Sequence, residues 1–316
     1  MDPAQFFTAP RLTIVAGKGG VGKTTVTATL ALAAARAGLR VLVVEIEGKF
    51  GLPALFDKPA LSYEELVLFE DLHGAGSVQA RTLTPDAALL EFLGDHGMRR
   101  LSRRLADSGA VDIVATATPG IKDVLVLGKV KQLERSRTYD AIIVDAPAAG
   151  HAITFLSSAK GLLDAVHVGP IESQAREVND MLTDETRCQV VLVTLPEETP
   201  VNELVETAYN LEDRIGIKLG PVVINGDYEH LDGIEVAPGD AAAAAGVTLD
   251  ARLSADLAAA SALRRERTAA QVSQIERLNR ELPLPQLRLP FVFRTDLDLD
   301  ALITLSDSVL DQVRAI

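Results

Sequence analysis

A glycine-rich run between an apolar segment and a helical segment is the strongest constraint that this sequence places on its fold. The run is Gly17-Lys18-Gly19-Gly20-Val21-Gly22-Lys23-Thr24-Thr25, and it matches the pattern G-x-x-x-x-G-K-[ST]. Apolar residues 12–16 precede the run, and Ala-rich residues 24–37 follow it. A strand that enters such a turn and continues as a helix is typical of a parallel α/β architecture.

The residue types in this run indicate phosphate binding. Glycines let several backbone N–H groups curve around an anion, and the helix that follows adds the positive end of its dipole. We expect Lys23 to act at the β- and γ-phosphates of a nucleotide and the Thr24 hydroxyl to ligate Mg²⁺. The other loop residues expected to bind the nucleotide are Gly19, Gly20, Val21, Gly22 and Thr25. The alternative is a glycine-rich turn without a ligand, but the pattern arises by chance in only about one chain of this size in a hundred.

Apolar, β-branched runs alternate with Ala-rich stretches along most of the chain. Such runs, hydrophobic on both faces, are what a buried parallel sheet requires. They cover residues 12–16, 41–46, 111–115, 141–145, 165–168, 189–194, 221–225 and 287–291. The pattern predicts an α/β fold of the P-loop type, with a mostly parallel sheet and helices on both faces.

Two stretches interrupt this alternation. Residues 51–110 look largely helical, and Thr84-Pro85 is a good helix start because Pro suits the first helical position. Residues 227–282 are polar at first and then rich in Ala and Arg, and Ala241–Ala245 is either helix or flexible linker. We therefore expect residues 1–316 to form a single P-loop domain with helical insertions at about 51–110 and 227–282.

Composition excludes several classes of function. The chain has 44 acidic and 31 basic residues, a formal net charge of −13, which argues against nucleic-acid binding and against a polybasic membrane anchor. No run of about 18 apolar residues occurs, so we expect no direct membrane span. The single cysteine, Cys188, cannot form an internal disulfide or a Cys-pair zinc site, and we interpret it as a buried, inert thiol. These features predict a cytoplasmic protein.

A second lysine, Lys18, stands directly after the first glycine of the loop. In this the loop resembles the deviant phosphate loop of the MinD, ParA, nitrogenase iron protein and arsenite-pump ATPases. The resemblance implies that Lys18 reaches across a dimer interface to the nucleotide of the partner, where a cation offsets charge on the transferred phosphoryl group. The partner would be a second copy or a paralogous ATPase. The alternative is an exposed loop lysine.

Two further motifs narrow the resemblance. Asp145-Ala146-Pro147-Ala148-Ala149-Gly150-His151 resembles the second switch, D-T-A-P-T-G-H, of the arsenite-pump and tail-anchored-protein-targeting ATPases, and Pro119-Gly120-Ile121 resembles their P-G-I motif. The likeness runs from residue 11 to about residue 291 and is greatest to the paired ATPases of actinobacteria that resemble tail-anchored-targeting factors. It implies that Asp145 holds Mg²⁺ through water, whereas a carboxylate that only caps its strand is the alternative. It also implies that the Gly150 backbone senses the γ-phosphate; we assign His151 no catalytic role.

The first switch departs from that family. The family reads D-P-A-H, with Asp polarising the attacking water, whereas Glu47 stands at the corresponding position here. The extra methylene moves the carboxylate by more than about 1 Å, a misplacement that can cost roughly 10²-fold in rate. Glu45 points to the same side of the strand, so either glutamate is a candidate for water activation. The alternative is a slow or silent site.

Base recognition is expected late in the chain. Asn225 ends an apolar run, and the corresponding Asn of the family hydrogen-bonds adenine. An amide donates and accepts at once, which suits the adenine edge. Pro290 and Phe291 match the loop that frames the other side of the base. The alternative for Asn225 is a plain strand terminator.

The cargo is not evident from the sequence. A single Cys and only three Met remove the thiol cluster of the arsenite pumps and the Met-rich groove of the targeting factors. An apolar pattern in one candidate helix fits core packing and cargo binding equally; it comprises Leu89, Leu90, Phe92, Leu93, Leu101 and Leu105. A basic cluster nearby is either a solvated face or a docking patch for an acidic partner; it comprises Arg99, Arg100, Arg103 and Arg104.

The resemblance implies an enzyme that binds ATP and Mg²⁺, dimerises around nucleotide and acts on an unknown protein or membrane-associated client. Glu47 motivates an alternative, a nucleotide-binding regulatory subunit with little hydrolysis that pairs with an active paralogue. A chromosome-positioning role of the ParA or MinD type lacks support, because the sequence has neither a basic DNA-facing surface nor a terminal amphipathic helix.

Overall fold

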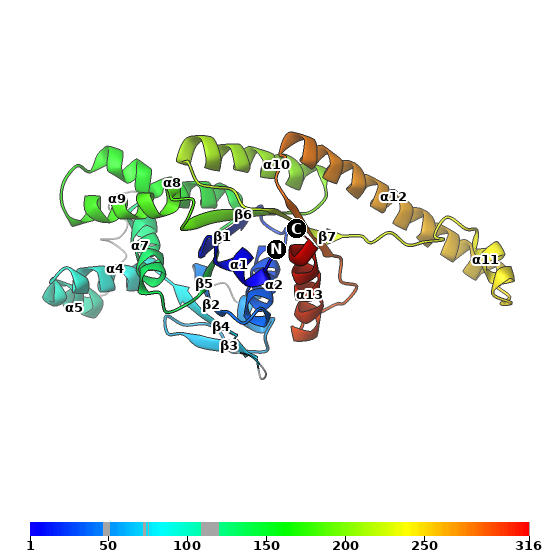
Figure 1. The fold of residues 1–316 in the computed structure, drawn as a ribbon, viewed down its shortest axis with the longest axis horizontal. Helices are drawn as coiled ribbons and strands as arrows, with labels where there is room; N and C mark the ends of the chain where they lie inside the picture. Colours follow the sequence, from blue (N-terminus) through cyan, green and yellow to red (C-terminus); the bar gives the residue numbers. More distant parts are fainter. Residues whose placement is uncertain (47–50, 72–73, 75, 109–119, 316) are drawn as a thin grey trace.

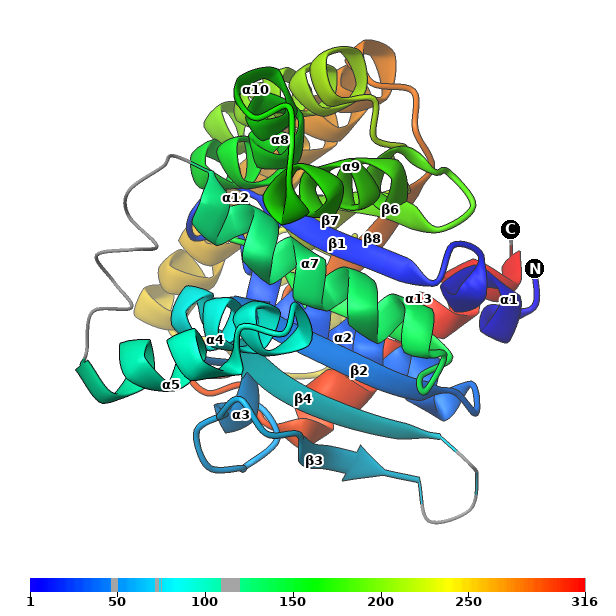
Figure 2. The same cartoon turned by 90° about the vertical axis from the view of Figure 1, so that its left-hand side faces the viewer.

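The computed structural model describes residues 1–46, 51–71, 74, 76–108 and 120–315. Within these ranges, eight strands form one twisted sheet in the order β3-β4-β2-β5-β1-β6-β7-β8 (Figures 1 and 2). All neighbouring strands are parallel except β3, which pairs antiparallel with β4 at one edge. The strands are β1 Leu12–Gly17, β2 Arg40–Ile46, β3 Leu66–Glu70, β4 Ser77–Leu83, β5 Ala141–Asp145, β6 Cys188–Thr194, β7 Val222–Asp227 and β8 Gln286–Pro290.

Helices cover both faces of this sheet, as the alternating pattern predicts. One face packs on α1 Pro3–Thr8, α2 Lys23–Arg36 and α13 Leu299–Ala315, and the other on α4 Pro85–Asp95, α7 Ile121–Ser136, α8 Ala149–Ala165, α9 Pro170–Thr183 and α10 Glu198–Tyr209 (Figure 2). A short π-helical turn, η1 Asn210–Ile215, continues α10. The sheet therefore has a separate hydrophobic core on each side, and the central strands are buried on both faces, as a parallel sheet requires.

Most predicted elements are confirmed. The strands at 12–16, 41–46, 141–145, 189–194, 221–225 and 287–291 are β1, β2, β5, β6, β7 and β8, and the helix after the glycine-rich run is α2. Thr84 caps α4 through a bond from the Ala87 N–H to its hydroxyl, with Pro85 at the first position. Cys188 is fully buried, and burial raises the pKa of its thiol.

The expectation for residues 51–110 is wrong in part. Helices α3 Gly51–Ala54, α4 and α5 Arg99–Ser108 lie there, but so do β3 and β4. Strand β3 carries a short apolar run, residues 66–69, which by length alone does not separate a strand from a turn of helix. It is also partly exposed, because an edge strand has a neighbour on one side only. The predicted strand at 111–115 lies outside the described residues.

The predicted strand at 165–168 is also wrong. Helix α8 continues to Ala165, and α9 starts at Pro170 after Gly169, which has a φ of 101°. Val168 is 83% exposed, and only Val166 of this run packs against the core. Three apolar residues and one histidine between a helix and a Gly-Pro helix start are too few to distinguish a strand from a connection.

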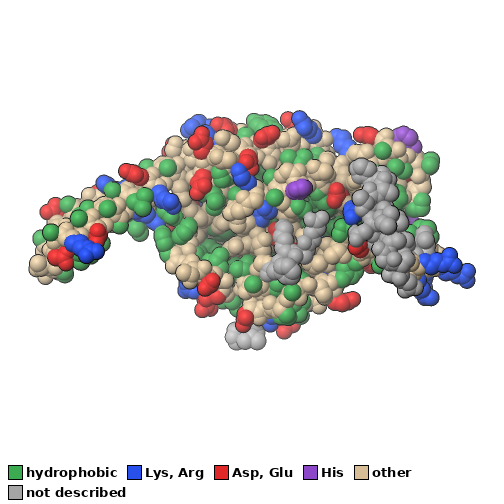
Figure 3. All heavy atoms as spheres, turned by 180° about the vertical axis from the view of Figure 1, so that it is seen from behind, with side chains coloured by type: hydrophobic (Ala, Val, Ile, Leu, Met, Phe, Trp, Pro, Cys, Tyr) green, Lys and Arg blue, Asp and Glu red, His purple; other side chains and the backbone are tan. Residues whose placement is uncertain are grey.

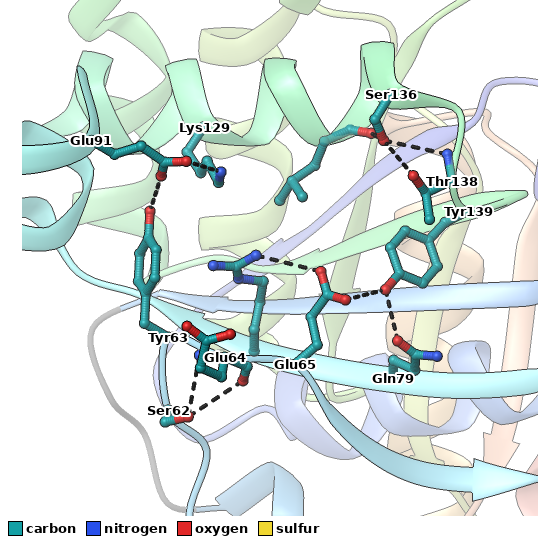
Figure 4. A network of polar contacts seen from close by, with 12 residues as sticks. Ser62, Tyr63, Glu64, Glu65, Gln79, Glu91, Lys129, Ser136, Thr138 and Tyr139 are labelled. Atoms are coloured by element: carbon teal, nitrogen blue, oxygen red, sulfur yellow. Dashed lines mark hydrogen bonds and ion pairs between the residues drawn. The ribbon is translucent and has the colours of Figure 1, made fainter. Parts of the chain in front are cut away.

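A network of polar contacts fastens the helical layer to the β3–β4 edge (Figure 4). Glu91 on α4 accepts hydrogen bonds from the Tyr63 hydroxyl and from the Lys129 ammonium on α7. Burial by itself raises the pKa of Glu91, but the bonds from Lys129 and Tyr63 outweigh it, so that the pKa lies below its ordinary value. The network therefore ties α4 and α7 to the segment that leads into β3.

The same network continues toward β5. Arg81 on β4 pairs with Glu65 at 3.4 Å, and its guanidinium lies 4.5 Å from the centroid of the Tyr63 ring. The Tyr139 hydroxyl donates to Glu65 at 2.6 Å. These side chains join the antiparallel edge hairpin to the parallel strands.

Residues 228–281, here called the arm, project from the body of the molecule (Figure 1). The arm contains α11 Pro238–Ala244 and α12 Ala251–Glu281, and the 31 residues of α12 span about 45 Å. Ile275 and Leu278, near the C-terminal end of α12, are its buried residues. Residues 227–282 thus contain two helices, and residues 241–244 of the Ala241–Ala245 tract belong to α11.

Candidate functional site

The loop between β1 and α2 has the geometry that the glycine pattern predicts. Gly20 and Gly22 have φ values of +87° and +85°, a region that favours glycine, and Gly22 is the N-cap of α2. A Cβ at Gly17 would lie 2.4 Å from the Val193 carbonyl oxygen, so a side chain there would displace β6. Gly19 has open space around it, and Val21 is buried. The loop thus places a helix N-terminus where backbone N–H groups can receive an anion.

The two lysines of the loop are held by different partners. The Lys23 ammonium is buried and donates to the Lys18 carbonyl oxygen at 2.9 Å. The Lys18 ammonium instead points to α10 and pairs with Glu203, with 2.5 Å between Nζ and Oε1. Both cations therefore lie at the phosphate loop, and Lys18 forms a contact within its own chain.

Two predicted magnesium ligands meet at the end of β5. The Thr24 hydroxyl donates to Asp145 Oδ2 at 2.8 Å, although 121 positions separate the two residues. Asp145 is fully buried, and Thr25 beside Thr24 is partly buried. A hydroxyl and a carboxylate at a phosphate loop are the oxygen donors that Mg²⁺ takes together with phosphate oxygens. The residues present thus fit Mg²⁺ held jointly with a nucleotide.

A second acidic residue, Glu45, lies next to Asp145. Glu45 on β2 is in register with Asp145 on the adjacent parallel strand, and it is fully buried. The Thr82 hydroxyl donates to Glu45 Oε1 at 3.4 Å. Val41 and Val43 alternate with Glu45 along β2 and belong to the core on the α2 side of the sheet, so Glu45 points to that side. Glu47 itself lies outside the described residues.

The predicted base-binding residues come together at the other end of the site. The Asn225 amide donates to the Val21 carbonyl oxygen at 3.0 Å, so it touches the phosphate loop itself. On neighbouring strands, Asn225 is in register with Leu289, and Pro290 follows. Phe291 packs over the same bend, since a Cβ at Gly226 would lie 3.6 Å from Phe291 Cδ2.

A cavity of about 540 Å³ borders this region. Its lining comprises Glu229, Leu231, Arg264, Pro290, Phe291, Val292, Phe293, Arg294, Ala301 and Thr304. Two predicted base-binding residues, Pro290 and Phe291, belong to this lining, and Arg264 comes from the arm. Nucleotide pockets commonly combine aromatic walls with a few polar groups, and this cavity has that character.

Sequence reasoning missed Glu203 and Gln271. Glu203 meets Lys18 only because α10 packs beside the loop, and Gln271 meets residues 226–228 only because α12 crosses the end of β7. Neither residue belongs to a recognisable motif. Phe293 also lines the cavity, and its position two residues after Phe291 is a weak sequence signal for that role.

The apolar pattern of residues 89–105, expected in one helix, lies on two helices, α4 and α5, and it supports core packing where its side chains are described. Leu89, Phe92 and Leu93 on α4 are buried, while the side chains of Leu101 and Leu105 lie outside the described residues. Four arginines of α5 are exposed, namely Arg99, Arg100, Arg103 and Arg104. Basic side chains gather at the end of the molecule opposite the arm (Figure 3).

Among residues 1–46, 51–71, 74, 76–108 and 120–315, no group of three or more His, Cys, Asp or Glu side chains is arranged to hold a metal ion. Within the same ranges, each helix is too short or too polar to cross a membrane.

The parallel sheet, the glycine-rich loop at the start of α2 and the Thr24–Asp145 pair define a P-loop nucleotide-binding protein. Comparison with known proteins narrows this class. The sequence profile of a family described as anion-transporting ATPase matches residues 10–169. The chain is 35% identical to the ATPase BagA of Mycobacterium tuberculosis over 321 positions, which cover 96% of this chain and 93% of that protein.

A more distant similarity links the chain to eukaryotic relatives. It is 24% identical to the ATPase get3 of Pyrenophora tritici-repentis over 225 positions. These positions cover 70% of this chain and 62% of that protein. The chain belongs to the anion-transporting ATPase family. The resemblance to the arsenite-pump and tail-anchored-protein-targeting ATPases is thereby confirmed at the level of the family.

Proposed function

We propose that this protein is an ATPase that binds ATP with Mg²⁺, dimerises around the nucleotide and uses the cycle to act on a protein or membrane-associated client. The observation that carries the proposal is the junction of the phosphate loop with the end of β5, where Thr24 bonds to Asp145. Lys23, Gly19, Gly20, Gly22 and the helix N-terminus would hold the phosphates. Membership of an ATPase family supports the same activity.

Adenine would lie near the ends of β7 and β8. Asn225 has one acceptor and two donor hydrogens on its amide, and the bond to Val21 uses one of those hydrogens. The remaining groups suit the adenine edge, and Pro290 and Phe291 would cover the ring. Contact between Asn225 and the phosphate loop links recognition of the base to recognition of the phosphates.

Hydrolysis would require a carboxylate to take a proton from water. The water oxygen then forms a bond to the γ-phosphorus while the bridging bond to the β-phosphate breaks, which leaves ADP and phosphate. Glu47 is the first candidate for this proton acceptor and Glu45 the second. When bound, Mg²⁺ would supply charge neutralisation at the phosphate oxygens, and Lys18 of a partner protomer would add a cation.

The partner would be a second copy or a paralogous ATPase, within a cytoplasmic assembly. Residues 1–316 would act as a single domain.

Glu47 in place of the family's Asp supports a second candidate function, a regulatory subunit that binds nucleotide but hydrolyses little. Phosphate release by the purified chain, alone and with a paralogue, separates the two functions. Light scattering with and without ATP measures the dimer.

Substitution Lys23→Ala tests the proposal. Loss of a buried, charged hydrogen-bond donor should lower the affinity for Mg-ATP by roughly 10- to 100-fold. Calorimetry measures the affinity, and Lys58→Ala, at an exposed position, is the control that keeps the change of charge. Equal ATP affinity in Lys23→Ala and the parent chain would show that the loop does not bind the nucleotide.

A further inference from the structure

A backbone bulge directly follows the proposed base-binding residue. In the pairing of β7 with β8, Asn225 is in register with Leu289 and Asp227 with Pro290, so that Gly226 is left out of the register. Gly226 has a φ of +72°, which a side chain would strain. Bulges of this kind bend a strand and re-aim the neighbouring side chain, here that of Asn225.

One side chain of the arm satisfies the backbone of this bulge. The Gln271 amide nitrogen on α12 donates to the Gly226 carbonyl oxygen at 3.1 Å, and its amide oxygen accepts from the Tyr228 N–H at 2.8 Å. Gln271 therefore bridges the residues on either side of Asp227. Because backbone groups that leave a strand ladder need other partners, Gln271 stabilises the bulge in its observed form.

The arm also packs on the aromatic side of the same region. The Arg264 guanidinium lies 4.1 Å from the centroid of the Tyr228 ring and 5.2 Å from that of Phe293. The Tyr228 and Phe291 rings meet edge to face, with 5.0 Å between their centroids. Cation–π contacts of this kind add to the attachment that Gln271 provides.

These contacts form a continuous path from the arm to the phosphate loop. Gln271 holds Gly226, Gly226 follows Asn225, and Asn225 bonds to the Val21 carbonyl. We infer that Gln271 is a positioning residue for base recognition, and that the seating of the arm and the binding of an adenine nucleotide stabilise each other. The inference rests on the proposed function, since it needs Asn225 to contact the base. By thermodynamic linkage the effect is reciprocal: the factor by which the seated arm raises the nucleotide affinity is the factor by which bound nucleotide favours the seated arm.

Base selectivity tests this inference. Calorimetry on the full chain measures the affinities for ADP and GDP, which share their phosphates and differ in the base. Gln271→Ala removes both bonds to the bulge, and we expect a roughly three- to tenfold loss of ADP affinity with little change for GDP. Ser273→Ala, at an exposed position on α12, is the matched control and should keep the parental ADP-to-GDP ratio.

Hydrogen exchange supplies the reciprocal measurement. ADP should slow exchange of the Tyr228 amide and of the neighbouring turns of α12 in the parent chain, and this protection should be reduced in Gln271→Ala. An equal loss of ADP and GDP affinity, or an unchanged ratio, would overturn the inference while leaving nucleotide binding intact. If the parent chain binds neither nucleotide, the proposed function itself fails. Thermal unfolding of each variant shows whether it is folded.

Discussion

The Lys18 ammonium is bound to the Glu203 carboxylate of the same chain, 185 positions away, with 2.5 Å between Nζ and Oε1. Glu203 lies on α10, which packs on the face of the sheet opposite α2, so this ion pair joins the phosphate loop to a helix of that face. The side chains are 35% and 42% exposed, and an ion pair with this exposure contributes only about 0–1 kcal/mol. The ion pair is therefore weak enough for Lys18 to exchange Glu203 for a phosphate of a nucleotide bound to a partner protomer.

Substitution Glu203→Gln should favour the nucleotide-bound dimer. A Lys18 that reaches across the interface must first leave Glu203, and the variant removes that competing anion. We expect the dissociation constant of the dimer with ATP to fall by up to roughly fivefold, the equivalent of the energy of an exposed pair. Analytical ultracentrifugation with and without ATP measures the change.

Glu206→Gln is the control for this experiment, because Glu206 is an exposed residue of the same helix and the substitution changes the charge equally. It should leave the ATP-dependent dimer unchanged. Added salt should narrow the difference between Glu203→Gln and the parent chain, since it screens an exposed pair. If the dimer weakens in Glu203→Gln, the ion pair supports the active arrangement and does not compete with it.

Alanine substitutions within the phosphate loop should differ sharply between two glycines. A Cβ at Gly22 would lie 2.3 Å from Asn225 Nδ2 and would require a φ of +85°, whereas a Cβ at Gly19 has no atom within 4 Å. Gly22→Ala should therefore displace Asn225 from Val21, cost about 1–2 kcal/mol of stability and weaken adenine nucleotide binding. Gly19→Ala should keep the parental unfolding temperature. Equal unfolding temperatures and ADP affinities in the two variants would contradict this reading of the loop.

One substitution tests the proposed role of Asp145 in holding Mg²⁺. Asp145→Asn keeps the size of the side chain and an oxygen for the Thr24 hydroxyl, but removes the negative charge. We expect the gain in ATP affinity that Mg²⁺ provides to fall by roughly 10- to 100-fold, as for other groups that act on a metal through water. Titrations with Mg²⁺ and with EDTA measure this gain. A parental response to Mg²⁺ in Asp145→Asn would assign Asp145 to the fold alone.

The central part of the fold could be predicted because each signal there is local. Strands β1, β2 and β5 are buried on both faces and read as continuous apolar runs, and the glycine-rich loop fixes the passage from β1 to α2. Strands β3 and β4 could not be predicted in the same way. Their stability depends on pairing at the sheet edge and on contacts such as that between Arg81 and Glu65, which the sequence does not reveal.

The same difference between local sequence signals and tertiary contacts applies to the candidate site. Thr24 and Asp145 each stand in a recognisable motif, and the structure brings them together. Glu203 and Gln271 act through helices whose packing is decided by tertiary contacts, so no spacing rule points to them. Glu47 remains a prediction.

The pH dependence of stability should reveal the Glu91 network. The Tyr63 and Lys129 hydrogen bonds hold the pKa of Glu91 below its ordinary value against the effect of burial, so the folded state binds this proton less tightly than the unfolded state. The stabilising contribution is therefore complete above the ordinary pKa of about 4.5. It is lost as the pH falls through the lower pKa of the folded state.

Glu91→Gln should destabilise the protein by about 1 kcal/mol at pH 7, a value reduced because a third of the side chain is exposed. The difference from the parent chain should shrink as the pH falls below about 4.5. Thermal unfolding across pH 3 to 7 measures it, with Glu64→Gln as the control because Glu64 is exposed beside Tyr63. A difference that stays constant over this range would show that Glu91 contributes by packing and not through its charge.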